Sequence, residues 1–147
     1  MDTLYIVIPA YNESENIKRT IEEWYPIVER HEGNGTSRLV IINDGSRDNT
    51  YEIAAAECEN RPLLTVLTKQ NGGHGSTVLY GYRYALEHGA DYIFQTDSDG
   101  QTDPAEFEKF WQIREVYDAI FGNRTSRGDG FSRAVVEKVL CAVLWTY

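Results

Sequence analysis

The 147-residue sequence has little of what defines several protein classes. Its two cysteines, Cys58 and Cys141, lie far apart, and neither belongs to a Cys-x-x-Cys pair or a histidine cluster. This argues against a disulfide framework or a zinc site and predicts two buried thiols in a reducing compartment. No apolar run is long enough to span a bilayer, and we expect no signal peptide before residues 4–8. These absences predict a cytoplasmic location, which includes the cytoplasmic face of a membrane.

Positive charge is also scarce. The chain has 14 Lys and Arg against 23 Asp and Glu, and its formal net charge is -9. Affinity for nucleic acid comes largely from Lys and Arg, so we expect no nucleic-acid partner. An anionic small molecule would need a metal cation or a local basic patch in order to bind. The hydrophobic content of 41% and the chain length are ordinary for one soluble globular domain.

Two nucleotide-binding fingerprints are missing as well. A dinucleotide-binding oxidoreductase carries Gly-x-Gly-x-x-Gly directly after its first strand, but here Pro9-Ala10-Tyr11-Asn12-Glu13 follows the apolar run at 4–8. A glycine-rich loop does occur at 71–75, yet it lacks the lysine and the spacing of a Walker A motif. The sequence therefore excludes a dinucleotide-binding oxidoreductase and does not contain a P-loop.

What is present is an alternation of strand-like and helix-like segments. Apolar runs of strand length lie at 4–8, 39–42, 63–67, 92–96 and, more weakly, 119–122. Helical patterns lie between them, the first preceded by Asn12 and Glu15, which resemble a capping pair. The alternation predicts an α/β fold, a doubly wound and mostly parallel sheet with helices on both faces. We expect a single domain over 1–147, shortened at its C-terminus because the last apolar helix has no stop signal.

The most informative segment is Asp97-Ser98-Asp99-Gly100-Gln101. It follows the strand-like run at 92–96, and residues two apart share one side of an extended segment, so Asp97, Asp99 and Gln101 can direct oxygen atoms at one point. Such hard oxygens suit a divalent cation that keeps positions for water or phosphate. The alternative is a solvated Asp/Gly turn. The preceding strand and the helix start at 103–106 favour the metal–diphosphate site.

Other polar residues follow the expected strands in the same way. Tyr11 and Glu13 follow the first, Asp44 the second, the glycine loop with His74 the third, and Arg124 the fifth. Each has a simpler interpretation: a helix entry, a turn, a flexible connection, or a loop histidine that binds no metal. Ligands of parallel α/β sheets bind beyond the carboxyl ends of the strands, however. The collection of these residues at one edge predicts a single ligand site.

Together these motifs resemble glycosyltransferase family 2. The segments at 8–13, 43–46, 71–75, 97–101 and 122–124 occur in the family's order and rough spacing, and they cover nearly all of the chain. The pattern is most similar to dolichyl-phosphate and polyprenyl-phosphate sugar synthases. The resemblance implies the GT-A fold and inverting transfer of a sugar from a UDP- or GDP-sugar to a polyprenyl or dolichyl phosphate. A saccharide or protein hydroxyl acceptor, and a non-catalytic nucleotide-sugar-binding module, stay open as alternatives.

The resemblance also implies roles for individual residues. Those expected to contact the nucleotide part of the donor are Pro9, Tyr11, Glu13, Asp44, Asn71 and Gly73. Those expected to bind Mg²⁺ or Mn²⁺ together with the diphosphate are Asp97, Asp99 and Gln101. Arg124 and Arg133 would face the donor or acceptor phosphate, and the catalytic set would be Asp97, Asp99 and Arg124.

The sequence departs from the family pattern near its end. It lacks the Gln-x-x-Arg-Trp signature of processive synthases and the downstream acidic residue that often serves as general base. A lipid phosphate is already an anion and needs no base, so this absence mildly favours a phosphate acceptor. The uncharged run at 139–145 is expected to be either a core helix or a helix at a membrane surface or subunit interface, for which Trp145 and Tyr147 are suited. The second interpretation predicts peripheral membrane contact or a homo-oligomer.

Overall fold

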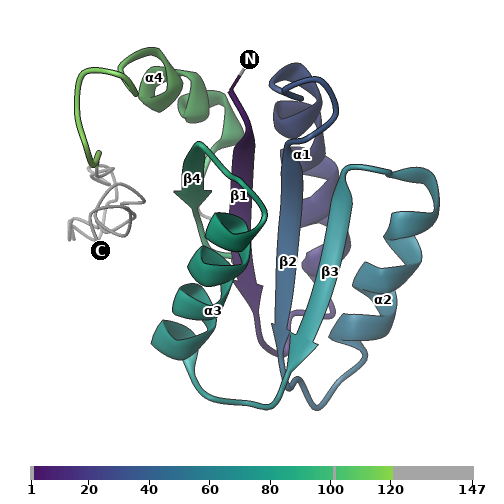
Figure 1. The fold of residues 1–147 in the computed structure, drawn as a ribbon. Helices are drawn as coiled ribbons and strands as arrows, with labels where there is room; N and C mark the ends of the chain where they lie inside the picture. Colours follow the sequence, from purple (N-terminus) through teal and green to yellow (C-terminus); the bar gives the residue numbers. More distant parts are fainter. Residues whose placement is uncertain (1, 101, 121–147) are drawn as a thin grey trace, which may run out of the picture.

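The computed structural model describes residues 2–100 and 102–120. In this part of the chain, four strands alternate with helices (Figure 1). The elements are β1 (Leu4–Ala10), α1 (Ile17–Arg30), β2 (Arg38–Asp44), α2 (Thr50–Ala56), the 3₁₀ helix η1 (Glu57–Asn60), β3 (Leu64–Lys69), α3 (His74–Glu87), β4 (Tyr92–Gln95), the 3₁₀ helix η2 (Pro104–Glu106) and α4 (Phe107–Gln112).

The four strands form one parallel sheet in the order β3-β2-β1-β4. All seven residues of β1 are buried, because this strand lies inside the sheet and helices cover both of its faces. This explains why the strand is a continuous apolar run rather than an alternating one. The predicted doubly wound parallel sheet is confirmed.

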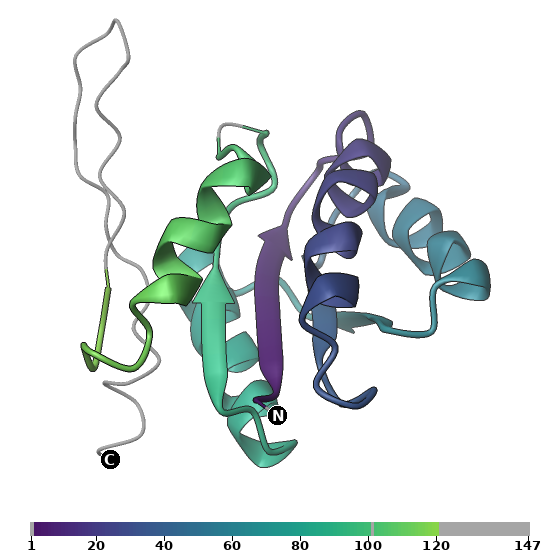
Figure 2. The same ribbon diagram turned by 90° about the horizontal axis from the view of Figure 1, so that it is seen from above.

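The two faces of the sheet carry different helices (Figures 1 and 2). Helices α1, α2 and α4 pack on one face, where the Phe94 ring lies 5.5 Å from Trp24 and 5.0 Å from Phe107. Helix α3 covers the other face alone among the described helices, against Tyr5, Val7, Val40, Ile42 and Ile93. Its start therefore stands over the carboxyl edge of the sheet on that side.

Several boundaries differ from the sequence-based expectations. Helix α1 begins at Ile17 and its N-cap is Asn16, so the expected Asn12–Glu15 capping pair is wrong. Strand β3 runs to Lys69, two residues beyond its expected end at 67. Residues 119 and 120 are not in a strand. The rest of the expected fifth strand, the loop after it and the final apolar helix lie outside the described residues. Within the described ranges, no helix is long and apolar enough to cross a membrane.

Candidate functional site at the carboxyl edge of the sheet

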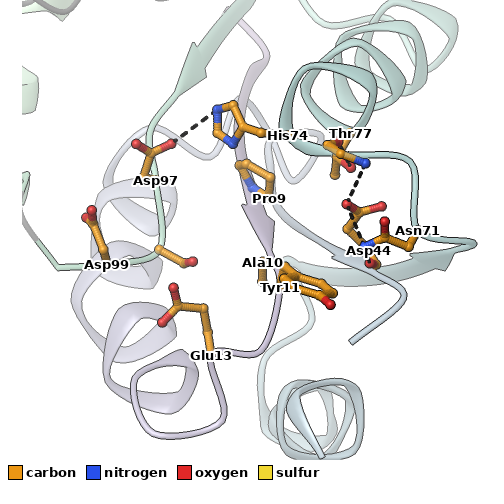
Figure 3. Close-up of a pocket in the computed structure, with 12 residues that line it drawn as sticks. Pro9, Ala10, Tyr11, Glu13, Asp44, Asn71, His74, Thr77, Asp97 and Asp99 are labelled. Carbon is orange, nitrogen blue, oxygen red and sulfur yellow. Dashed lines mark hydrogen bonds and ion pairs between the residues drawn. The ribbon is translucent and has the colours of Figure 1, made fainter. Parts of the chain in front are cut away.

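A cleft of about 450 Å³ opens at the carboxyl ends of β1, β2 and β4, beside the start of α3. Eight residues that the sequence predicted to bind substrate or metal line it: Pro9, Tyr11, Glu13, Asp44, Asn71, Gly73, Asp97 and Asp99. Figure 3 shows Asp97 and Asp99 on one side of the cleft and Asp44 and Asn71 on the other, with Tyr11 between them. The fold thus brings together residues from four separate loops.

The acidic turn after β4 is held from three directions. Asp97 Oδ1 accepts a hydrogen bond from Gln95 at 3.3 Å and lies 3.7 Å from His74 Nε2. The buried hydroxyl of Thr20 on α1 donates to the backbone oxygen of Ser98 at 3.3 Å. Gly100 has a φ of +81°, in the left-handed region that favours glycine. These contacts keep the Asp97–Asp99 segment at the cleft wall.

The carboxylates of the acidic turn fit a divalent cation that is bound partly by substrate. Over residues 2–100 and 102–120, no group of three or more His, Cys, Asp or Glu side chains is arranged to hold a metal ion. Mg²⁺ commonly takes only one or two protein carboxylates and completes its shell with water and substrate phosphate oxygens. Asp97 and Asp99 place two carboxylates at the wall of the cleft, which is the number that such a site requires. The third expected ligand, Gln101, lies outside the described residues.

Asp44 forms the opposite wall of the cleft. Its side chain is only 5% exposed, and it accepts hydrogen bonds from Lys69 Nζ at 2.9 Å and from the backbone N–H groups of Gly72 and Gly73 at 2.9 and 3.0 Å. Burial works to raise the pKa of this carboxyl group, but the hydrogen bonds, that from Lys69 foremost, outweigh burial and hold the pKa below its usual value. Asp44 is therefore a charged group at neutral pH, held by a lysine and a glycine loop.

The β1–α1 loop, which carries Tyr11 and Glu13 into the cleft, is fastened to the β2–α2 loop. Three of its backbone amides donate to side chains of that loop or of the first residue of α2: Asn12 N to Ser46 Oγ at 2.9 Å, Glu13 N to Thr50 Oγ1 at 2.9 Å, and Ser14 N to Asp48 Oδ2 at 3.3 Å. The Asn12 side chain accepts a hydrogen bond from Arg47 N at 2.8 Å. Tyr11 stays 44% exposed and lines the cleft.

The structure places most of the residues that the sequence singled out at this cleft, but not all of them. Arg124 and Arg133 lie outside the described residues. His74, interpreted from sequence as a loop residue, is the first residue of α3 and lines the cleft. Lys69 was missed, because the expected third strand stopped at 67. A signal existed, since both Asp44 and Lys69 end a strand, but only the register of β2 against β3 places them opposite each other.

Known structures share this arrangement of strands and helices. A crystal structure of residues 1–349 of TarS from S. aureus superimposes with a TM-score of 0.60 and 18% identity, over 80% of this chain and 33% of that one. The mannosyltransferase PcManGT from Pyrobaculum calidifontis, solved in complex with GDP-Man and Mn²⁺, gives a TM-score of 0.53 and 21% identity, over 65% of this chain and 27% of that one. The fold is the α/β GT-A fold of nucleotide-sugar transferases, as the sequence resemblance implied.

Curated sequences point in the same direction. A UDP-N-acetylglucosamine–dolichyl-phosphate N-acetylglucosaminyltransferase from Methanococcus voltae is 29% identical over 151 aligned residues, which cover 92% of this chain. The chain spans 57% of that relative's length. The family model described as glycosyl transferase family 2 matches residues 5–139, which is most of the 147 residues. On this match, the chain belongs to glycosyl transferase family 2.

Proposed function

We propose that this chain carries the donor site of an inverting glycosyltransferase, which moves a sugar from a metal-bound nucleotide-diphosphate sugar to a polyprenyl or dolichyl phosphate. The observation that supports the proposal is that an exposed aromatic ring, Tyr11, and an acidic pair, Asp97 and Asp99, line one cleft. A nucleotide sugar has a flat base at one end and a charged diphosphate in the middle. The cleft offers an apolar surface for the first and metal-binding oxygens for the second.

The donor would lie across the cleft. Tyr11 would stack on the base, beside Pro9, while Glu13 and the Asp44 wall with Asn71 and Gly73 would enclose the base and ribose. Asp97 and Asp99, with Gln101, would hold Mg²⁺ or Mn²⁺ and so place the diphosphate at the acidic turn. A bound divalent cation supplies charge neutralisation for the leaving diphosphate. The metal complex of the Pyrobaculum neighbour is consistent with this choice of ion.

The acceptor is inferred from the relatives and from the chemistry. The Methanococcus relative is named for a dolichyl-phosphate acceptor. A phosphate monoester is already anionic at neutral pH and attacks the anomeric carbon without a general base, whereas a sugar hydroxyl needs one. Arg124 and Arg133 would approach a donor or acceptor phosphate. A lipid acceptor would also require contact with a membrane surface, for which the segment 139–147 is the proposed point of contact.

A turnover assay that compares three acceptor conditions tests this function. The full chain is incubated with UDP- or GDP-sugars and Mn²⁺, with a polyprenyl phosphate, with a saccharide, or with no acceptor. We expect a glycosyl phosphate lipid with inverted anomeric configuration, formed only when lipid phosphate and divalent cation are both present. Transfer only to the saccharide would show that the acceptor is a hydroxyl group and not a lipid phosphate. Donor binding by calorimetry without turnover on any acceptor would reduce the proposal to a nucleotide-sugar-binding module.

A further inference from the structure

The Asp44 carboxylate lines the cleft and accepts several hydrogen bonds from the protein itself. A carboxylate has about four lone-pair positions. Oδ1 accepts from Lys69 Nζ and Gly72 N, both at 2.9 Å, and Oδ2 accepts from Gly73 N at 3.0 Å and from Asn71 Nδ2 at 3.5 Å. The shorter bond of Asn71 Nδ2, at 2.9 Å, goes to the backbone oxygen of Asp44. The geometry therefore assigns Asp44 a role in holding the 71–73 loop.

Lys69 is built into this arrangement. It lies directly opposite Asp44 in the β2–β3 register, and its side chain is only 14% exposed. Its Nζ donates a second hydrogen bond, to the backbone oxygen of Gln70 at 2.9 Å. A Cβ on Gly72 would lie 3.0 Å from this nitrogen, so the ammonium group sits directly beneath the glycine loop. A lysine that is largely removed from water needs such partners, because separating its charge from water is costly.

The loop held by this ion pair forms part of the cleft. Asn71 and Gly73 both line it, and Gly73, with a φ of +97°, is the N-cap from which α3 begins. The turn after β2 packs closely against the same loop, since a Cβ on Gly45 would lie 2.7 Å from the backbone nitrogen of Asn71. A shift of the loop would therefore change one wall of the cleft and the position of the α3 start.

The charge of Lys69 matters for an anionic ligand. Three other carboxylates line the cleft, on Glu13, Asp97 and Asp99. Without Lys69, the buried Asp44 would add an uncompensated negative charge to the wall of a cleft that these three carboxylates already line. Removing one partner of a buried ion pair leaves the other charge uncompensated, which costs more than removing both.

We propose that Lys69 is a positioning residue of the donor site, which acts through Asp44 to hold the 71–73 loop and the start of α3 in their donor-binding arrangement. The expected effect on donor binding rests on the proposed function. The contacts by which Lys69 and Asp44 hold the 71–73 loop are a property of the ligand-free chain. Neither residue contacts the reacting atoms in this scheme.

A double-mutant cycle on the full chain tests it. Lys69→Met is expected to speed amide hydrogen exchange at Gly72 and Gly73 without nucleotide and to weaken donor affinity about tenfold or more, as for an unpaired buried polar group. Adding Asp44→Asn to Lys69→Met removes the unpaired charge and is expected to recover part of that affinity. Lys69→Arg keeps the charge and should stay close to wild type. Lys109→Met, which removes a lysine of an exposed ion pair on α4, is the matched control and should change neither quantity.

Each result decides one question. If Asp44→Asn lowers donor affinity by the same factor in both the wild-type and Lys69→Met backgrounds, Lys69 does not act through Asp44 and the proposal is overturned. Unchanged exchange at Gly72 and Gly73 in folded Lys69→Met also overturns it. If Lys69→Met does not fold, loss of donor binding in both Lys69→Arg and the double variant would overturn it. If the wild-type chain binds no nucleotide sugar, the proposed function is wrong. Hydrogen exchange at Gly72 and Gly73 would still test whether Lys69 holds the 71–73 loop.

Discussion

The Nε2 atom of His74 lies 3.7 Å from Oδ1 of Asp97, so the first residue of α3 faces the acidic turn after β4 across the cleft (Figure 3). The 71–73 loop just before α3 contacts Asp44 on the opposite wall. The start of α3 and the loop before it therefore touch both walls of the cleft. A ligand placed between the walls would contact three strand ends and this helix at once. The binding predictions for Asp99, Tyr11 and Asp44 depend on this arrangement.

The acidic turn is expected to make donor binding depend on a divalent cation. Asp99→Ala removes one of two carboxylates at the proposed metal position and should nearly abolish donor affinity, while the fold stays intact because the residue is exposed at a strand end. Titration calorimetry with a UDP- or GDP-sugar and Mn²⁺ measures this. Glu87→Ala, on the exposed part of α3, is the matched control. An unchanged affinity in Asp99→Ala that EDTA does not reduce would refute the metal assignment.

The exposed ring of Tyr11 is expected to bind the base by stacking. Tyr11→Ala should weaken binding of both free UDP and free GDP by about 1–3 kcal/mol, the usual value of stacking between a base and an aromatic side chain. Tyr80→Ala removes an equally exposed tyrosine from α3 and should have no effect. If calorimetry finds the same affinity in wild type and Tyr11→Ala, the base lies elsewhere in the cleft.

The wall opposite the acidic turn gives a second binding prediction. Asp44→Ala should weaken nucleotide binding by about 1–3 kcal/mol, because the donors that now meet its carboxylate would lose their partner and the loop its anchor. The measurement is calorimetry with free UDP and GDP. Asp44→Ala binding both nucleotides as tightly as wild type would show that this wall does not contribute to the base pocket.

Helix α3 is expected to need glycine at its closest approach to the sheet. A Cβ on Gly81 would lie 2.4 Å from Val7 Cγ1 and 2.6 Å from Ile42 Cδ1. Gly81→Ala should therefore lower the free energy of unfolding by about 1–3 kcal/mol, as for other overpacked cores. Gly75→Ala on the same helix is the control, because a Cβ there meets nothing within 4 Å. Equal melting temperatures for the two variants would contradict the close packing.

The lowered pKa values of two aspartates, Asp44 and Asp48, predict how the stability of the fold depends on pH. For both Asp44 and Asp48, burial works to raise the pKa, but accepted hydrogen bonds, chiefly from Lys69 and Thr50 respectively, outweigh it and lower the pKa. A pKa that is lower in the folded state stabilises the fold above the unfolded value, and this stability is lost as the pH falls through the folded value. We expect the free energy of unfolding, measured by urea titration, to fall as the pH drops below about 4. Asp48→Asn should show a smaller loss, and a level profile in wild type would contradict the assignment.

Much of the fold could be predicted because its signals are local. A strand covered on both faces must be apolar throughout, so the segments around Val7 and Ile41 identify parallel strands directly. Parallel strands have their carboxyl ends at one edge, so the polar residues that follow them were expected to meet there, and the cleft lined by Tyr11, Asp44 and Asp97 is where the structure places them. The helix start at Asp103 was equally readable, and its side chain accepts the expected hydrogen bond from Ala105 N at 3.0 Å.

The remaining features depend on contacts between segments far apart in sequence. From sequence Asn12 resembles a helix cap. In the structure it has a φ of 55° and its side chain accepts a hydrogen bond from Arg47 N, so that it connects the β1–α1 and β2–α2 loops. Lys69 looks like a polar residue after a strand, but the register of β3 on β2 places it beside Asp44. The sequence by itself determined the positions of the four described strands and most of the polar residues that follow them. The tertiary structure decided which of those residues are paired, because register and loop packing arise only when the sheet is assembled.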